Sequence, residues 1–385
     1  MKITVVCDVL GESNNGTTIA AFNLINYLRK KGHEVRILCA DADKKGQDGY
    51  FVVPTLNLGI FNGYVAKNGV TLAKADKTVI ESAIDGVDVV HVMLPFFLGQ
   101  ATAKIAKERG VPLSAGFHLL AENFSTHIFM AKVGVVNRLT YVYFHKMYKR
   151  CDCIHYVTQH VRNLYEKMYG KTKGYVISNG VNEVFRPAHV NSDDGLIRIL
   201  YTGRYSKEKS HKVLIAAVDK SKYRDKIQLI LAGEGPLKET LVKQAERLPV
   251  KPVFGFFSRE EMVTVDNSAD LYVHAAEYEA EGIGCLEAIA CGVVPIICNS
   301  ERSATRFYAL DDRSLFKRGS PADLAGKIDW WIEHPRERAE YSERYARLSR
   351  EKFDHEACME AMEKMLAETA DLRKKNGVSD KKRSK

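Results

Sequence analysis

Apolar runs typical of buried strands alternate with helical patterns along nearly the whole of this 385-residue chain. The first series begins with a strand at 3–9, continues with a helix at 17–32 and ends with a strand near 151–158. A second series runs from a strand at 196–203 to another at 293–299. Continuous apolar strands separated by helices form parallel sheets that are covered on both faces. The pattern therefore predicts an α/β protein with two Rossmann-like domains.

The length of the chain supports two domains, because single hydrophobic cores rarely grow beyond about 250–300 residues. Glycine, asparagine and proline cluster at 178–187, where we place the boundary. The expected domains are 1–178 and 187–354, followed by an amphipathic helix over about 355–375.

Composition fits an ordinary soluble protein, with 45% hydrophobic and 27% charged residues. No run of about 18 apolar residues predicts a transmembrane helix. The chain opens directly on a strand pattern without a cleavable signal, and its eight cysteines form no C-x-x-C pair. We therefore expect reduced thiols and a cytoplasmic location.

The segment 279–292, EAEGIGCLEAIACG, carries the most specific motif. Glu279 precedes a glycine-rich turn at 282–284, and Glu287 stands one turn into the helix that follows. A helix N-terminus offers unpaired amides to an anion, and a carboxylate on either side can bind hydroxyl groups. A nucleotide sugar presents polar groups in this same order: sugar hydroxyls, then phosphates, then the ribose diol. A helix with solvated glutamates is the alternative, but the glycines and the buried strand after the helix favour a site.

This segment resembles the glutamate–seven residues–glutamate signature of retaining glycosyltransferases of family 4, which have the GT-B fold. The resemblance implies two Rossmann-like domains with parallel sheets facing across a cleft, and a terminal helix that packs back on the first domain. It also implies that Glu287 binds the ribose diol and that Glu279 binds a sugar hydroxyl. The amides near Gly282, Ile283 and Gly284 would then hold the diphosphate.

The segment LYTGRYSKEKS contributes positive charge at a strand end. Gly203 closes the strand, and Arg204 and Lys209 follow as groups suited to a diphosphate. They resemble the family's arginine and lysine, which neutralise the departing diphosphate in a metal-free transfer. The family has glycine after that lysine, whereas this chain has Ser210, so Lys207 is a rival assignment.

Further matches to the family are shorter. Gly16 precedes the first helix, and Gly233 lies in the strand-to-helix turn of LILAGEGP. Phe254 and Gly255 fall where family members hold the nucleobase. His118, which follows the strand LSAGF, resembles the family histidine that reaches the donor sugar and is assigned to catalysis with Glu279, Arg204 and Lys209.

No histidine, cysteine or carboxylate cluster shows metal-ligand spacing along the chain, so we expect neither a metal nor another cofactor. His91, in VVHVMLPFF, also lies near the end of a predicted strand, as His118 does, but we do not predict it to be a site residue.

The net charge of +9 calls for an acidic partner. No acidic residue occurs between Glu122 and Asp152, where five basic residues alternate with apolar and aromatic ones. Such a segment either lies on an anionic membrane through 127–150, chiefly through its tip at 127–138, or is a core helix with a basic outer face. The run GFHLLAENFSTH also resembles family members that act on lipids.

These observations predict a retaining hexosyltransferase that moves a sugar from a nucleotide-diphosphate donor, UDP-glucose by resemblance, to a membrane lipid such as diacylglycerol. It would lie peripherally at the inner face of the cell membrane. The alternatives are a soluble or polysaccharide-precursor acceptor, a GT-B nucleotide-sugar epimerase and, with less support, a nucleic-acid-binding protein. An epimerase needs additional acid–base residues, and we expect no nucleic-acid partner.

Overall fold

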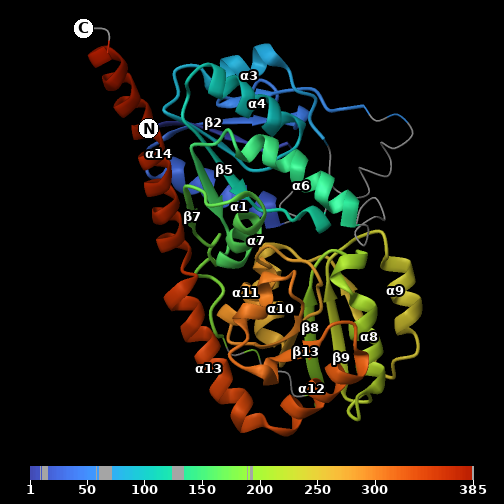
Figure 1. The fold of residues 1–385 in the computed structure, drawn as a ribbon. Helices are drawn as coiled ribbons and strands as arrows, with labels where there is room; N and C mark the ends of the chain where they lie inside the picture. The colour runs from blue at the N-terminus through green and yellow to red at the C-terminus, as the bar shows by residue number, and fades with distance from the viewer. Residues whose placement is uncertain are drawn as a thin grey trace. The chain divides into compact units, whose positions relative to one another are not determined.

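A computed structural model describes residues 1–8, 10, 16–57, 59, 72–123, 134–188, 190 and 194–383, with side chains described up to 372. The chain forms two compact units. The first contains Met1–Ser178 together with Cys358–Lys385, and the second contains Asn179–Ala357. Each unit is an α/β structure built on one parallel sheet (Figure 1).

The first unit holds a seven-stranded sheet in the order β3-β2-β1-β4-β5-β6-β7. All of its neighbouring strands pair in parallel. The strands are β1 (Lys2–Val6), β2 (Glu34–Cys39), β3 (Tyr50–Val52), β4 (Val89–Val92), β5 (Leu113–Phe117), β6 (Cys153–Tyr156) and β7 (Gly174–Val176). The helices are α1 (Gly16–Lys30), α3 (Lys77–Ile84), α4 (Phe97–Glu108), α6 (Gly134–Tyr148), α7 (Gln159–Tyr169) and α14 (His355–Arg383).

The C-terminal helix α14 packs into the core of the first unit. Met362, Met365 and Leu366 are buried together with residues of β1 and α1. At the edge of this contact the Glu363 carboxylate lies 2.7 Å from Nε2 of His33. A helix that covers one face of the sheet buries the apolar side chains of β1, which would otherwise face water.

The second unit holds a six-stranded parallel sheet in the order β10-β9-β8-β11-β12-β13. Its strands are β8 (Ile197–Thr202), β9 (Ile227–Ala232), β10 (Val253–Gly255), β11 (Leu271–His274), β12 (Val294–Asn299) and β13 (Leu315–Lys317). Its helices are α8 (His211–Lys220), α9 (Lys238–Ala245), α10 (Arg259–Ser268), α11 (Ile283–Ala290), α12 (Pro321–Glu333) and α13 (Pro335–Lys352).

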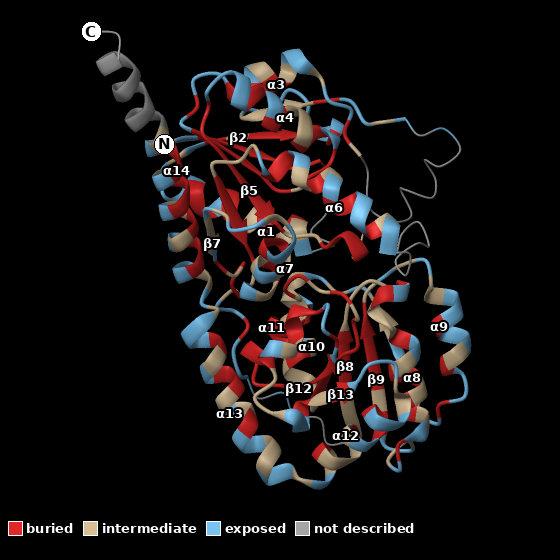
Figure 2. Ribbon diagram, viewed as in Figure 1, coloured by how far each residue is buried: buried red, intermediate tan, exposed pale blue. Residues whose placement is uncertain are grey.

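Burial follows the expected two-faced pattern. The central strands β1, β4, β5, β8, β9 and β11 are largely buried, whereas most helices bury one side and expose the other; α11 is the exception and has no exposed residue (Figure 2). The predicted two parallel-sheet domains are confirmed. Strands β3, β7 and β13 were not predicted, because strands of three residues at a sheet edge carry too little apolar pattern to be recognised.

No helix in the described part of the chain combines the length and the apolar character needed to cross a membrane.

Candidate functional site

The carboxyl ends of four neighbouring strands bring the predicted donor-site residues to one edge of the second sheet. Strands β10, β9, β8 and β11 are adjacent and parallel, so the turns after them lie along the same edge. Chain order reverses between β8 and β11, because β9 and β10 extend the sheet on one side of β8 and β11 begins the other side. Ligands of open α/β sheets bind at such a switch point.

Glu279 and Lys209 form an ion pair across this switch point. Lys209 ends the short 3₁₀ turn Lys207–Lys209 after β8, and Glu279 follows β11. The Glu279 carboxylate also lies 3.6 Å from Nε2 of the buried His274. Burial by itself would raise the pKa of Glu279, but the Lys209 charge and the His274 contact outweigh it and lower the pKa to about 2. Glu279 is therefore a carboxylate at neutral pH.

The backbone holds Glu279 in place as well. Its amide donates to the Arg302 carbonyl over 3.4 Å, and its own carbonyl accepts from the Ala304 amide at 2.9 Å. Two backbone bonds on opposite sides of one residue fix the position of its Cα. The carboxylate is thus presented from a rigid segment next to the start of α11.

The turn into α11 requires glycine. Gly282 has φ +84°, and a Cβ there would lie 2.5 Å from Cγ2 of Thr305. A Cβ on Gly284 would lie 3.1 Å from Cβ of Thr202. The first turn of α11 therefore packs directly against the end of β8, and α11 starts at Ile283 with its first amides at the switch point.

Glu287 sits on α11 and pairs with Arg259, the first residue of α10. Burial raises the pKa of Glu287, although Arg259 opposes the shift. Asp266 lies fully buried near this pair, and burial followed by the Glu287 charge raises its pKa well above the usual range. The Arg259 guanidinium also lies 4.9 Å from the ring centroid of Phe185. Arg259 thus balances the charge of Glu287, which is the more accessible of the two buried carboxyl groups.

The turns after β8 and β9 are packed backbone to backbone. A Cβ on Gly233 would lie 2.1 Å from the carbonyl oxygen of Gly203, and one on Gly235 would lie 2.7 Å from backbone atoms of Tyr205. Arg204, in the first of these turns, is half-buried. Phe254 packs edge-to-face against Tyr205, with ring centroids 6.0 Å apart, and Gly255 ends β10.

The two candidate lysines occupy different environments. Lys209 is largely buried against Glu279, whereas the side chain of Lys207 is exposed. The Tyr201 hydroxyl donates to the Lys209 carbonyl at 2.6 Å, which fixes that end of the turn. Ser210, which replaces the family's glycine, adopts a left-handed conformation with φ +53°. The backbone shape that a glycine would supply is therefore retained.

The predicted residues of the first unit are described separately. Gly16 is the exposed first residue of α1, and residues 11–15 before it lie outside the described residues. His118 follows β5, and its ring lies over Gly116. Its pKa falls well below the usual value because of burial and two neighbouring histidines. The assignment of His118 to the donor sugar remains a prediction.

Only part of the basic, aromatic segment is described. Residues 124–133, including the tip residues Phe129, Met130, Lys132 and Val133, lie outside the described residues. The rest forms α6, on which Val135, Leu139 and Val142 are 68%, 63% and 43% exposed. Tyr141, Phe144 and Met147 cover its other, buried side. The structure thus combines a core-facing side with an exposed apolar stripe.

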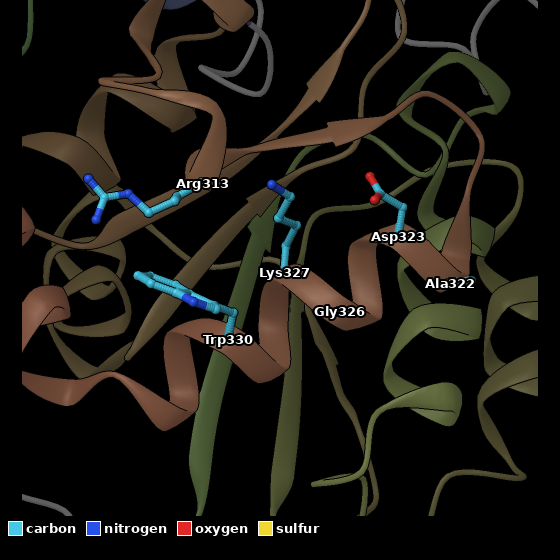
Figure 3. Close-up of a pocket in the computed structure, with 6 residues that line it drawn as sticks. All are labelled: Arg313, Ala322, Asp323, Gly326, Lys327 and Trp330. Carbon is cyan, nitrogen blue, oxygen red and sulfur yellow. The ribbon is translucent and has the colours of Figure 1, made fainter.

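A separate pocket opens on α12 and is lined by Arg313, Ala322, Asp323, Gly326, Lys327 and Trp330 (Figure 3). The Arg313 guanidinium lies 5.6 Å from the Trp330 ring centroid. The lining includes none of the predicted site residues.

Sequence reasoning missed His274, Arg259 and Glu281 at this edge. Glu281 accepts hydrogen bonds from the backbone amide of Asn179, at 3.0 Å, and from the Asn179 side chain. These bonds connect the start of the second unit to the segment 279–292. The placement of His274 at the end of β11 was the signal available for it. Arg259 offered a weaker signal, since a basic residue at the start of a helix is ordinarily unfavourable.

Comparison with known proteins places this architecture in a family. The model for glycosyltransferase family 4 matches residues 14–185, and that for glycosyl transferases group 1 matches residues 185–349. The chain therefore belongs to the family 4-like glycosyltransferases of the GT-B fold and is a hexosyltransferase.

Curated relatives extend the match across most of the chain. The alpha-monoglucosyldiacylglycerol synthase of Streptococcus pneumoniae is 25% identical over 78% of this chain and 71% of its own length. A GDP-mannose-dependent alpha-mannosyltransferase of Corynebacterium glutamicum is 23% identical over 77% of this chain and 72% of its own. Anabaena HepE, solved with UDP-glucose, has the same fold, with a TM-score of 0.74 at 17% identity over 96% of this chain and all of that one.

The low pKa of Glu279 predicts a pH-dependent stability of the second unit. Its folded pKa of about 2 lies below its ordinary value of 4.5, so the contribution is fully present above about pH 4.5 and is lost as the pH falls toward 2. Wild type should exceed Glu279→Gln in unfolding free energy by an amount on the order of 3 kcal/mol at pH 7, shrinking toward pH 2.5. Both tryptophans of the chain, Trp330 and Trp331, lie in this unit, so their fluorescence reports its unfolding.

Glu234→Gln is the matched control, because Glu234 is an exposed carboxylate at the same sheet edge that pairs with Lys238. Its difference from wild type should be small at both pH values. A Glu279→Gln difference that stays constant between pH 7 and 2.5 would contradict the assigned pKa.

Proposed function

We propose that this protein transfers glucose from UDP-glucose to a membrane lipid such as diacylglycerol, with retention of configuration. The observation that carries the donor half of this proposal is the Lys209–Glu279 ion pair at the switch point beside the N-terminus of α11. It places a fixed carboxylate, a cation and unpaired amides at one strand edge, which are the groups a nucleotide-diphosphate sugar requires.

In this proposal each group acts on one part of the donor. Arg204, Lys209 and the amides of Ile283 and Gly284 bind the diphosphate, whose charge increases as the sugar departs. Glu279 accepts hydrogen bonds from sugar hydroxyls, and its low pKa keeps it an acceptor at neutral pH. Lys209 contacts both the carboxylate and the leaving group, so binding of the diphosphate and orientation of the sugar are coupled.

Glu287 would bind the ribose diol. Arg259 holds its carboxylate through a charge-assisted contact, which orients one oxygen and leaves the other to accept from hydroxyls. The nucleobase would lie by Phe254 and Gly255 at the end of β10, where backbone groups supply its hydrogen bonds. Gly233 would act indirectly, because it lets the turn after β9 pack against the Gly203 carbonyl, directly before Arg204.

The relatives support the choice of donor and acceptor without deciding it. One is named for glucosyl transfer to diacylglycerol, another for GDP-mannose, and a structural neighbour was solved with UDP-glucose. The sulfoquinovosyl transferase of Arabidopsis thaliana is 25% identical over 87% of this chain. We favour UDP-glucose with diacylglycerol, and a comparison of UDP-glucose with GDP-mannose tests the donor directly.

The exposed stripe of α6 supports a membrane-bound acceptor. Val135, Leu139 and Val142 are spaced so that they share one helix face, and the exposed side chains of Arg138 and Lys146 continue that face. Apolar groups flanked by basic ones suit the headgroup region of an anionic bilayer. We therefore propose that the first unit rests on the membrane through α6 and the segment that precedes it.

Replacing Glu279 by glutamine should lower transfer from UDP-glucose to diacylglycerol in detergent micelles by at least about tenfold. The reason is that a neutral amide binds the sugar hydroxyls less strongly in the transition state, and about 1.4 kcal/mol corresponds to a factor of ten. The assay follows labelled glycolipid with time, and GDP-mannose replaces UDP-glucose in a parallel series. Glu234→Gln should retain wild-type turnover. Unimpaired transfer by Glu279→Gln would exclude Glu279 from the sugar contact.

The diphosphate contact predicts a selective loss of affinity. Arg204→Ala and Lys209→Ala should each weaken binding of UDP by roughly tenfold to a hundredfold, the effect of about 1.5–3 kcal/mol for a bond to a charged group, while binding of uridine changes little. Calorimetric titration with both ligands measures the difference. Lys207→Ala serves as the control, because its side chain is exposed. Equal losses for UDP and uridine, or a larger loss in the control, would remove Lys209 from the diphosphate site.

The α6 surface predicts salt-sensitive membrane binding. Wild type should co-sediment with vesicles containing phosphatidylglycerol, less with neutral vesicles and less again at high salt, since each basic residue near the surface contributes about 1 kcal/mol that salt screens. Val135→Ser, Leu139→Ser and Val142→Ser together should reduce sedimentation without changing UDP affinity. Val242→Ser, an exposed valine of the second unit, is the matched control. Equal sedimentation of the triple variant and wild type would assign α6 to ordinary surface.

A further inference from the structure

Three histidines from separate segments of the first unit converge at one point. His91 lies in β4, His118 directly follows β5 and His155 lies in β6, and these three strands are adjacent in the sheet. One ring nitrogen from each lies within 4.8 Å of the other two. Because the three residues are far apart in the sequence, spacing along the chain could not indicate this cluster.

The strand register explains the convergence. His91 pairs with Ser114, and His155 pairs with Gly116, so His91 and His155 lie on the same face of the sheet on either side of β5. The gap between them falls at Gly116, where a Cβ would lie 2.3 Å from Nε2 of His118. The absence of a side chain at 116 thus leaves room for the His118 ring to lie between the two others.

The hydrogen bonds of the cluster leave nitrogen lone pairs directed inward. His155 uses Nε2 to donate to the Ile177 carbonyl at 2.7 Å, so its Nδ1 carries a lone pair. His91 Nδ1 lies 2.9 Å from Oγ of Ser114, whose own hydroxyl is directed to the Val90 carbonyl at 3.4 Å. When the Ser114 hydroxyl donates to Val90, His91 donates to Ser114, and in that tautomer its Nε2 also carries a lone pair.

No polar partner for these inward nitrogens exists among the described residues. His91 Nε2, His118 Nε2 and His155 Nδ1 are all buried and make no hydrogen bond there. A proton on His118 Nε2 could satisfy one of the other two nitrogens, but not both. Leaving a buried acceptor unpaired is unfavourable, and a shared cation would satisfy all three lone pairs at once.

We propose that His91, His118 and His155 bind one divalent transition-metal ion of the zinc type. Neutral imidazoles are preferred ligands of such ions, and the cluster offers three ring nitrogens within 4.8 Å of one another. The bonds from His155 to Ile177 and from His91 to Ser114 are the outer hydrogen bonds that orient metal-binding histidines. Three nitrogens at 2.0–2.1 Å from a tetrahedral ion lie roughly 3.4 Å apart, so rings whose nitrogens lie within 4.8 Å of one another would draw closer on binding the ion.

This proposal gives His118 a second proposed role, because the same side chain is also assigned to the donor sugar. The test therefore measures metal content, which is read independently of turnover. The proposal also revises the expectation of a metal-free chain, which rested on ligand spacing alone. Three protein nitrogens leave coordination positions open to water.

The test uses the full chain without a histidine tag, stripped with chelator and titrated with Co²⁺, whose visible absorption reports its ligands. Wild type should bind one ion per chain. His91→Asn and His155→Asn should each weaken binding by more than about a hundredfold, and Ser114→Ala, which removes only an outer hydrogen bond, by about tenfold. His334→Asn, in the second unit, is the control and should match wild type.

Zn²⁺ provides a second readout, since an ion that binds only the folded chain raises its melting temperature. The rise should occur in wild type and in His334→Asn and should be absent in His118→Asn. If a histidine variant fails to fold, the cobalt titrations of wild type and Ser114→Ala still decide the question. Wild type that takes up no stoichiometric Co²⁺, or cluster variants that bind it as tightly as wild type, would overturn the proposal.

Discussion

The parallel pairing of buried strands is the constraint on which the rest of this structure depends. Strands such as β1, β4, β8 and β11 are buried on both faces, so polar side chains are confined to the strand ends or must find partners inside. Parallel direction brings all carboxyl ends to one edge of each sheet. The second unit gathers charged side chains at that edge, and the first gathers neutral imidazoles between adjacent strands.

Buried carboxyl groups in the second unit show how their neighbours together decide the direction of a pKa shift. Glu279 has Lys209 and His274 beside it, and its pKa falls to about 2 despite burial. Glu287 has only Arg259 to oppose burial, and its pKa rises. Asp266 lies beside the Glu287 charge, and its pKa rises further. Three acids within one unit thus differ because Coulomb attraction exceeds desolvation only where a cation is in direct contact and further groups assist.

The histidine cluster follows the opposite principle. No carboxylate contributes to the shifts of His91, His118 or His155, so burial lowers their pKa values and keeps the rings neutral. Neutral rings in a dry interior require hydrogen-bond partners or a metal. Two of them already use one nitrogen each on Ile177 and Ser114, and the remaining nitrogens face one another. The histidine cluster therefore presents lone pairs, whereas the Glu279–Lys209 pair presents charge.

The two-sheet architecture could be predicted from local patterns in the sequence, because parallel sheets require apolar periodicity and alternation of strands and helices. Turn composition at strand ends also indicated the glycines at 282 and 284 and the residues Glu279, Arg204 and Lys209, and the family resemblance added Glu287 on the helix that follows. The pairing of Glu279 with Lys209 rather than Lys207, and that of Glu287 with Arg259, depend on how separate strands and helices pack in the folded chain. The histidine cluster likewise depends on strand order and register, which bring together residues that no local pattern connects.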